Sequence, residues 1–103
     1  MLVDLVISRL HTKSTLPHLK AHIEEKLERL SRWMDHLHKA TVILDDGGHQ
    51  HSVEICVSVD GGPRLVGHAE SDDWLEAVNQ AESKLETQIR RFQDRRRTKS
   101  RVH

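Results

Sequence analysis

The stretch "HSVEICVSVD" (His51–Asp60) decides the fold, because apolar and polar side chains alternate along it without interruption. A period of two places successive side chains on opposite faces of an extended chain, which predicts a half-buried strand of an antiparallel sheet. Glycine-rich turns at its two ends, "GGHQ" (Gly47–Gln50) and "DGGP" (Asp60–Pro63), predict a hairpin on each side. The apolar face carries Val53, Ile55, Val57 and Val59, and the polar face carries Ser52, Glu54, Cys56 and Ser58.

Three further segments have the composition of strands, and two of them flank the central one. β-Branched and other apolar residues dominate each segment, as is typical of a pleated, half-buried backbone. The segments are "LVDLVIS" (Leu2–Ser8), "ATVILDD" (Ala40–Asp46) and "RLVGHAE" (Arg64–Glu70).

Two other segments repeat apolar residues every three or four positions, which predicts two amphipathic helices. The first is expected to begin after Ser14 or Thr15, either of which can cap it, and to end near His38, a length of about 35 Å. The second follows the capping and acidic residues Ser71–Asp73. The first apolar stripe is Leu16, Leu19, Ile23, Leu27, Leu30, Met34 and Leu37, and the second is Trp74, Val78, Ala81, Leu85, Ile89 and Phe92.

The resulting order is β-α-β-β-β-α, and it predicts an α+β fold. Two helices with one apolar stripe each need one apolar sheet face to cover, so we expect a two-layer sandwich with both helices on one side of a four-stranded sheet. The first crossover should be right-handed if its strands are parallel. A chain of 103 residues has the length of one domain. We expect that domain to span residues 1–97, followed by a flexible basic tail, residues 98–103.

Composition excludes several classes of protein. The 16 basic and 16 acidic side chains balance, so any binding of a polyanion must come from a local patch rather than from overall charge. The single cysteine, Cys56, allows neither an internal disulfide nor a cysteine-rich zinc site. The N-terminal segment lacks the basic region and cleavage site of a signal peptide, and no apolar run is long enough to span a membrane. We therefore expect a cytoplasmic protein without a membrane partner.

The charges of both predicted helices are segregated on a helical wheel. One flank of the first helix carries His18, His22, Lys26, Arg29, Arg32 and His36. One flank of the second helix carries Lys84, Arg91 and Arg95, with Arg90 toward the outer face and Glu82 and Glu86 on the opposite flank.

Two interpretations of this segregation stay open. The charges can be solvated helix faces joined by i,i+4 ion pairs, for which Glu25–Arg29, Glu28–Arg32 and Glu86–Arg90 have the right spacing. Alternatively, the basic flanks bind a phosphate backbone while the acidic side faces away. The excess of arginine over lysine, ten to six, suits bidentate phosphate contacts.

No pattern of catalytic or metal-binding residues is present. Nine histidines include the i,i+4 pair His18 and His22 and the close pair His49 and His51, but no HExxH arrangement occurs, so we interpret them as surface residues. No serine has the context of a nucleophile elbow, and Cys56 has no obvious base beside it. We expect neither an enzyme nor a cofactor nor a metal site.

Three quoted segments, taken together and in order, resemble the ribosome hibernation promoting factors, also called ribosome-associated inhibitor proteins. "EEKLERLSRWMD" (Glu24–Asp35) is similar to the family's first-helix signature, and "HSVEICVSVDGG" (His51–Gly62) is similar to its third strand and turn. "HAESDDWLEAVNQAESKLETQIRR" (His68–Arg91) contains the family's Ala-Glu-x-x-Asp start and Lys-Leu-x-x-Gln core.

The resemblance implies a fold related to double-stranded-RNA-binding domains. It also implies binding to the small ribosomal subunit and its rRNA, in the channel between head and body that mRNA and the A-site and P-site tRNAs use. Translation would then be silenced without catalysis, in stressed or stationary-phase cells. The positions that match the family's RNA-contacting residues are Lys26, Arg29, Lys84, Arg91 and Arg95, to which the helical wheel adds Arg32 and Arg90.

The chain departs from the family at several basic positions. Thr87, Phe92 and Gln93 stand where the family usually has basic residues. The chain resembles the short members, which lack a dimerisation domain, so we expect a monomer; any pairing of ribosomes would need a separate factor or a different surface. Two alternatives remain open: a regulatory module that modulates a sigma factor, for which a sheet edge could accept a partner strand, and a general double-stranded-RNA-binding protein.

Overall fold

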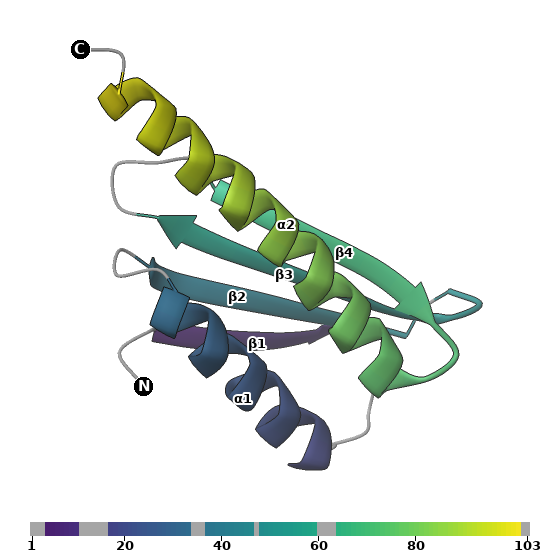
Figure 1. Ribbon diagram of the computed structural model, residues 1–103. Helices are drawn as coiled ribbons and strands as arrows, with labels where there is room; N and C mark the ends of the chain where they lie inside the picture. Colours follow the sequence, from purple (N-terminus) through teal and green to yellow (C-terminus); the bar gives the residue numbers. More distant parts are fainter. Residues whose placement is uncertain (1–3, 11–16, 34–36, 47, 60–63, 102–103) are drawn as a thin grey trace.

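The computed structural model describes residues 4–10, 17–33, 37–46, 48–59 and 64–101. Its elements follow the predicted order β-α-β-β-β-α (Figure 1). They are β1 (Asp4–Leu10), α1 (Pro17–Trp33), β2 (Leu37–Asp45), β3 (His51–Val59), β4 (Arg64–Ser71) and α2 (Trp74–Arg101). The predicted turn at Asp60–Pro63 and the predicted caps Ser14 and Thr15 lie outside the described residues.

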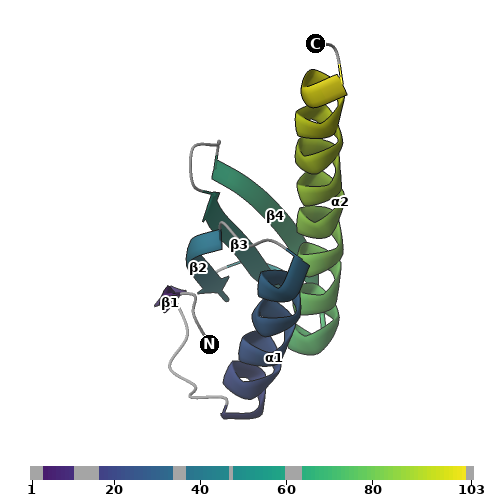
Figure 2. The same cartoon turned by 60° about the vertical axis from the view of Figure 1, so that its left-hand side comes forward.

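The four strands form one sheet in the order β1-β2-β3-β4. β1 and β2 are parallel, whereas β2–β3 and β3–β4 are antiparallel. Both helices lie on the same side of this sheet and run side by side, as Figure 2 shows. The predicted two-layer α+β sandwich is therefore confirmed.

The alternation in β3 places its apolar face against the helices. Val53, Ile55 and Val57 are completely buried, and Val59 is nearly so. The buried part of the α2 stripe, Val78, Ala81, Leu85 and Ile89, packs against this face, while Trp74 and Phe92 cover its margins. The predicted core of β3 and α2 is thus confirmed.

The predicted end of the first helix is wrong. Helix α1 ends at Trp33, which makes it about 25 Å long, and Leu37 begins β2 opposite Val59. The register of β2 shifts between Leu37 and Lys39, and this bulge lets Leu37 join Ala40 in the core. The predicted stripe continued from Leu30 through Met34 to Leu37, and these helical spacings of four and three extended the helix into a residue that belongs to β2.

The start of α2 is capped as predicted. The Oδ1 atom of Asp73 accepts a hydrogen bond of 3.2 Å from the backbone N–H of Leu75, and Ser71 Oγ accepts one of 3.2 Å from the N–H of Asp73. These bonds satisfy N–H groups that a helix start leaves without partners.

Helix α2 continues through Arg101 and extends beyond the sheet (Figure 1). Residues 98–101, predicted as part of a tail, are therefore helical in backbone; the flexibility of that tail stays a prediction. Within the described segments, no helix combines the length and apolarity needed to cross a bilayer.

Candidate RNA-binding surface

Helix α2 lies directly on β4 because residue 67 is glycine. A Cβ atom at Gly67 would approach the backbone oxygen of Ala81 to 2.1 Å and the backbone nitrogen of Leu85 to 2.9 Å. Both distances are far below van der Waals contact, so only a residue without a side chain allows this approach. The position of the basic residues of α2 relative to the sheet depends on this contact.

Two side chains of α2 bind the outer backbone of β4, and we call them the edge clamp (Lys84 and Gln88). Gln88 accepts a hydrogen bond of 3.2 Å from the N–H of Val66 and donates one to the carbonyl of the same residue. Lys84 Nζ donates a hydrogen bond of 2.8 Å to the carbonyl of His68. Because β4 is an edge strand, these bonds satisfy backbone groups that would otherwise face solvent or another chain.

The edge clamp gives the Lys-Leu-x-x-Gln motif a structural role. Leu85 is fully buried, and the residues on its two sides in the motif hold the strand. Lys84, a predicted RNA contact, uses one of its three donors on the protein itself and remains exposed. Lys84 can still attract a phosphate, but its role in the fold is to hydrogen-bond the edge strand β4.

The basic flank of α2 begins at Lys84 and continues along the exposed helix. Arg91 and Arg95 are both exposed on it. Arg90, also exposed, forms the predicted ion pair with Glu86 at 3.0 Å. We call Lys84, Arg91 and Arg95 the helix-two flank.

The basic flank of α1 consists of Lys26, Arg29 and Arg32, and we call these three residues the helix-one flank. His22, on the same side of the helix, bridges to Asn79 of α2 at 2.8 Å between Nε2 and Oδ1. Lys26 is half-buried, while Arg29 and Arg32 are exposed. Lys26 and Arg29 of the helix-one flank therefore lie near the second helix, whereas Arg32 pairs with Glu28 on its own helix.

The predicted separation of basic and acidic sides is wrong for α2. Glu82 lies within the electrostatic reach of Lys26 and Arg29, so the acidic flank of α2 faces the helix-one flank instead of pointing away. The wheel correctly placed Glu82 and Lys84 on opposite flanks, but it could not show which flank faces the neighbouring helix. The two basic flanks are consequently separated by Glu82 and Glu86.

Burial dominates the electrostatics of Glu82. Desolvation raises the pKa of its carboxyl above the ordinary value of 4.5, and the charge of Glu86 and a hydrogen bond with it act in the same direction. Lys26 and Arg29 oppose this effect. The sequence pattern did not indicate Glu82 as part of the site, although its place next to Ala81 in the apolar stripe is a signal of burial.

Two of the three predicted i,i+4 ion pairs are confirmed. Glu86–Arg90 and, at the longer distance of 4.0 Å, Glu28–Arg32 are both present. All four side chains keep solvent contact, and exposed pairs of this kind contribute only about 0.3–0.5 kcal/mol each. Such weak pairing leaves the arginines able to exchange a carboxylate for a phosphate.

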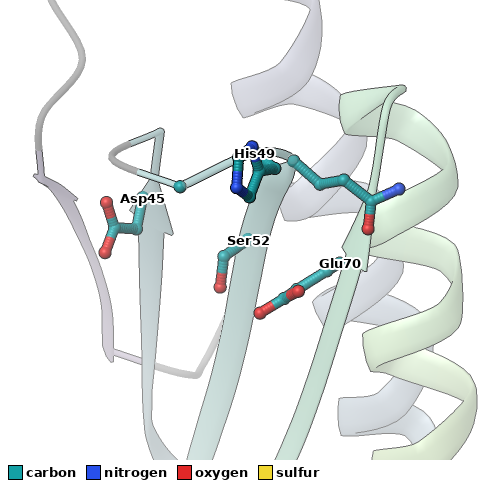
Figure 3. Close-up of a pocket in the computed structure, with 6 residues that line it drawn as sticks. Asp45, His49, Ser52 and Glu70 are labelled. Atoms are coloured by element: carbon teal, nitrogen blue, oxygen red, sulfur yellow. The ribbon is translucent and has the colours of Figure 1, made fainter.

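The opposite face of the sheet carries a pocket of a different character (Figure 3). It has a volume of about 310 Å³ and is lined by Asp45, Gly48, His49, Gln50, Ser52 and Glu70. The carboxylates of Asp45 and Glu70 lie on either side of Ser52, on three adjacent strands. Two carboxylates disfavour a phosphate here, and the described residues contain no group of three or more side chains able to hold a metal.

Fold and surface define a small α+β protein that presents two charged helices on one side of a four-stranded sheet. Residues 6–97 match the family model described as sigma 54 modulation protein / S30EA ribosomal protein. The chain belongs to this family, and the resemblance noted from the sequence is confirmed.

Two characterised relatives support this assignment. Ribosome-associated factor Y of Haemophilus influenzae is 34% identical over 77 residues, which cover 75% of this chain and 71% of that protein. Ribosome hibernation promoting factor of Pseudomonas putida is 28% identical over 92 residues, which cover 89% and 88% of the two chains.

Solved structures confirm the fold. The N-terminal domain of Thermus thermophilus Protein Y superposes with a TM-score of 0.74 at 30% identity, covering 86% of this chain and 98% of that domain. A ribosomal subunit interface protein from Coxiella burnetii gives a TM-score of 0.73 at 23% identity and covers 91% and 99% of the two chains.

Proposed function

We propose that this protein is a ribosome-associated regulator of translation that binds rRNA of the small subunit through the helix-one and helix-two flanks. The observation that carries the proposal is the concentration of positive charge on α2. Between residues 84 and 101, eight basic side chains stand against two acidic ones, on a helix that extends past the sheet. The names of the relatives, a ribosome-associated factor and a ribosome hibernation promoting factor, point to the same partner.

The proposed mechanism is occupation without catalysis. Bound in the channel of mRNA and of the A-site and P-site tRNAs, the protein would exclude these ligands sterically. Arginine residues on a helix suit this role because the helix fixes the spacing of their Cα atoms and each planar guanidinium can contact a phosphate through a pair of hydrogen bonds. Seven residues are proposed as contacts: Lys26, Arg29, Arg32, Lys84, Arg90, Arg91 and Arg95.

A regulatory protein-interaction module is the second candidate function. The position of β1 at the end of the sheet and its exposed apolar side chains favour it. β1 stands at the free end of the sheet order, and Val6 and Leu10 on it are 41% and 46% exposed. Such an edge can accept a strand of a partner protein. A ribosome-binding test under varied salt separates the candidates, because only phosphate contacts release counterions.

The test is co-sedimentation with purified small ribosomal subunits across a salt series. The double variant Arg91→Glu and Arg95→Glu should bind at least about tenfold more weakly, because each removed phosphate contact lowers both affinity and salt dependence. These two positions are preferable to Lys84, whose substitution would also open the edge clamp. Added mRNA or tRNA should displace the parent protein if the binding channel is the proposed one.

A matched control is the double variant Lys20→Glu and Lys39→Glu. Both lysines are exposed and lie outside the two basic flanks. Two lysine-to-glutamate changes alter the net charge by the same amount as the two arginine-to-glutamate changes. The control should bind within about twofold of the parent, since long-range effects of exposed charges are screened at moderate salt. Equal binding of the Arg91 and Arg95 variant and the parent would show that the helix-two flank is not the RNA site.

A further inference from the structure

The sheet has a second face, which points away from the helices, and none of the described elements covers it (Figure 2). We call this side the outer face; on β4, where buried and exposed residues alternate, it carries Arg64, Val66, His68 and Glu70. Apolar side chains on it keep contact with solvent, since Val6 is 41% and Val66 is 36% exposed. A bare sheet face with exposed apolar side chains is a candidate surface for a protein partner.

Positive and negative side chains occupy opposite ends of the outer face. At one end, Lys39 of β2 and Arg64 of β4 flank the same residue of β3, Ser58, and we call these two cations the basic row. At the other end, Asp45 of β2 and Glu70 of β4 line the pocket of Figure 3, and we call them the acidic row. Asp45 is half-buried, and the other three charged residues are exposed. The outer face therefore has a positive end and a negative end.

An apolar row crosses the outer face next to the basic row. The strand registers place Val6, Thr41, Cys56 and Val66 side by side on the four strands. Cys56 is buried although it points outward, because the guanidinium of Arg64 lies over it and donates a hydrogen bond of 2.9 Å to its sulfur. This hydrogen bond keeps the arginine close to the sheet, where a carboxylate on a facing surface can reach it.

The basic row and the acidic row are placed symmetrically on the sheet. Six positions separate Arg64 from Glu70 on β4, which is about 20 Å along the strand. The same number separates Lys39 from Asp45 on β2, and the midpoints of both pairs lie level with Ile55 of β3. A second copy, turned over by half a rotation about the line through these midpoints, therefore sets each basic row over the acidic row of the other copy.

Two copies in this arrangement can make contact across the whole outer face. Packed sheets lie about 10 Å apart with strand directions within about 30° of each other, a gap that an arginine and a glutamate side chain span together. Each strand lies over its own counterpart, so Arg64 of one copy meets Glu70 of the other. Between the charged rows, Val6 and Val66 enter the contact and displace water, which strengthens the attraction between the charges. The two-fold axis produces every contact twice.

We propose that the outer face is a self-complementary interface for a second copy of this chain, with the basic row of each copy on the acidic row of the other. The inference is independent of the proposed function, because both helices point away from this interface and the basic flanks stay accessible (Figure 2).

The size of the outer face determines how stable the dimer is. A contact of about 20 Å by about 15 Å on each copy buries on the order of 1,000 Å² in total, the low end for specific interfaces. We therefore expect a dissociation constant on the order of tens of micromolar. The monomer implied by the family resemblance is then the form at low concentration, and the dimer is the form at high concentration.

The test is sedimentation equilibrium of the purified protein without ribosomes, from about 5 μM to about 500 μM, a range that spans the expected dissociation constant. Arg64→Glu places an acid over the acidic row, and Glu70→Arg places a base over the basic row. Each single variant should raise the dissociation constant at least about tenfold, because the repulsion occurs at two symmetric contacts. A thiol reductant is present throughout, since Arg64→Glu uncovers Cys56.

The decisive sample is an equimolar mixture of the two single variants. In a mixed pair every arginine again faces a carboxylate, at both symmetric contacts. The mixture should therefore form heterodimers with a dissociation constant within about threefold of the parent value, although neither variant dimerises alone. Recovery of the dimer also establishes that both variants are folded.

Matched controls reverse the same charges on the helix layer. Lys20→Glu and Glu76→Arg are exposed positions on α1 and α2, and both variants should dimerise like the parent. A parent protein that stays monomeric at every concentration overturns the inference. So does a parent dimer that both reversals leave intact, because it must use another surface, and so does a mixture that dimerises no better than either variant alone.

Discussion

At the scale of single residues, Gly67 determines how closely α2 packs on β4, and the burial of Glu82 determines its pKa. Gly67 has no side chain, and this absence sets the distance between α2 and β4. Glu82 has a charge that its burial opposes. Neither property is visible in a helical wheel or in strand alternation, because each depends on a neighbour distant in sequence.

Substitution of Gly67 by alanine should destabilise the protein by about 3 kcal/mol or more, because the added methyl group collides with helix backbone that cannot rotate away. Urea denaturation of the purified variant measures this loss. Gly48→Ala is the matched control, since a Cβ at that position meets nothing within 4 Å. A Gly67 variant as stable as the Gly48 variant would contradict the close packing of α2 on β4.

Substitution of Glu82 by glutamine should stabilise the free protein at neutral pH. The folded protein holds its proton at Glu82 more tightly than the unfolded chain does, because the folded pKa is raised above 4.5. Stability therefore falls as the pH rises from 4.5 through the folded pKa, and glutamine removes this loss. Thermal melts of both proteins at about pH 7.5 and below pH 4.5 measure the difference, which should vanish in the acidic sample.

At the scale of elements, the edge clamp links a sequence motif to the protection of a strand. Leu85 anchors the helix, while Lys84 and Gln88 reach around the edge of β4 to its outward backbone groups. Protein edges are commonly protected by charged residues or by covering segments, and this clamp combines the two devices.

Removal of Gln88 should cost about 1–2 kcal/mol, because two backbone groups of Val66 lose their protein partner. Hydrogen exchange of the Val66 amide in Gln88→Ala gives the most direct measurement, and its protection should fall far below that in the parent. Gln80→Ala is the control, since Gln80 is bonded only locally to Glu76. Retained protection of Val66 in the Gln88 variant would contradict the clamp.

The same scale shows what the sequence could predict. The alternation of β3 and the apolar stripe of α2 are local patterns, and both were confirmed. The boundary between α1 and β2 failed because Leu37 continues the spacing of the helical stripe although it belongs to β2. Of the candidate site, the charged residues and their flanks were visible, whereas the contact of Lys84 with β4 and the influence of the α1 cations on Glu82 join segments far apart in sequence.

At the scale of the whole molecule, a chain of zero net charge gathers some of its charges into local clusters. The extended end of α2 is strongly basic, whereas the pocket on the opposite face of the sheet contains Asp45 and Glu70. A polyanion approaching in solution would be oriented by this dipole before contact. Neutrality overall and affinity for RNA are therefore compatible.

The edge clamp also bears on assembly. Of the two strands at the ends of the sheet order, β4 has backbone groups of Val66 and His68 bonded to α2, and no described segment pairs with the outer side of β1. The edge at β1 is therefore the more open of the two to an added strand. Two copies that pair through their β1 strands would form one continuous sheet with a β4 strand at each end. The bonds between α2 and β4 would then oppose the addition of further copies.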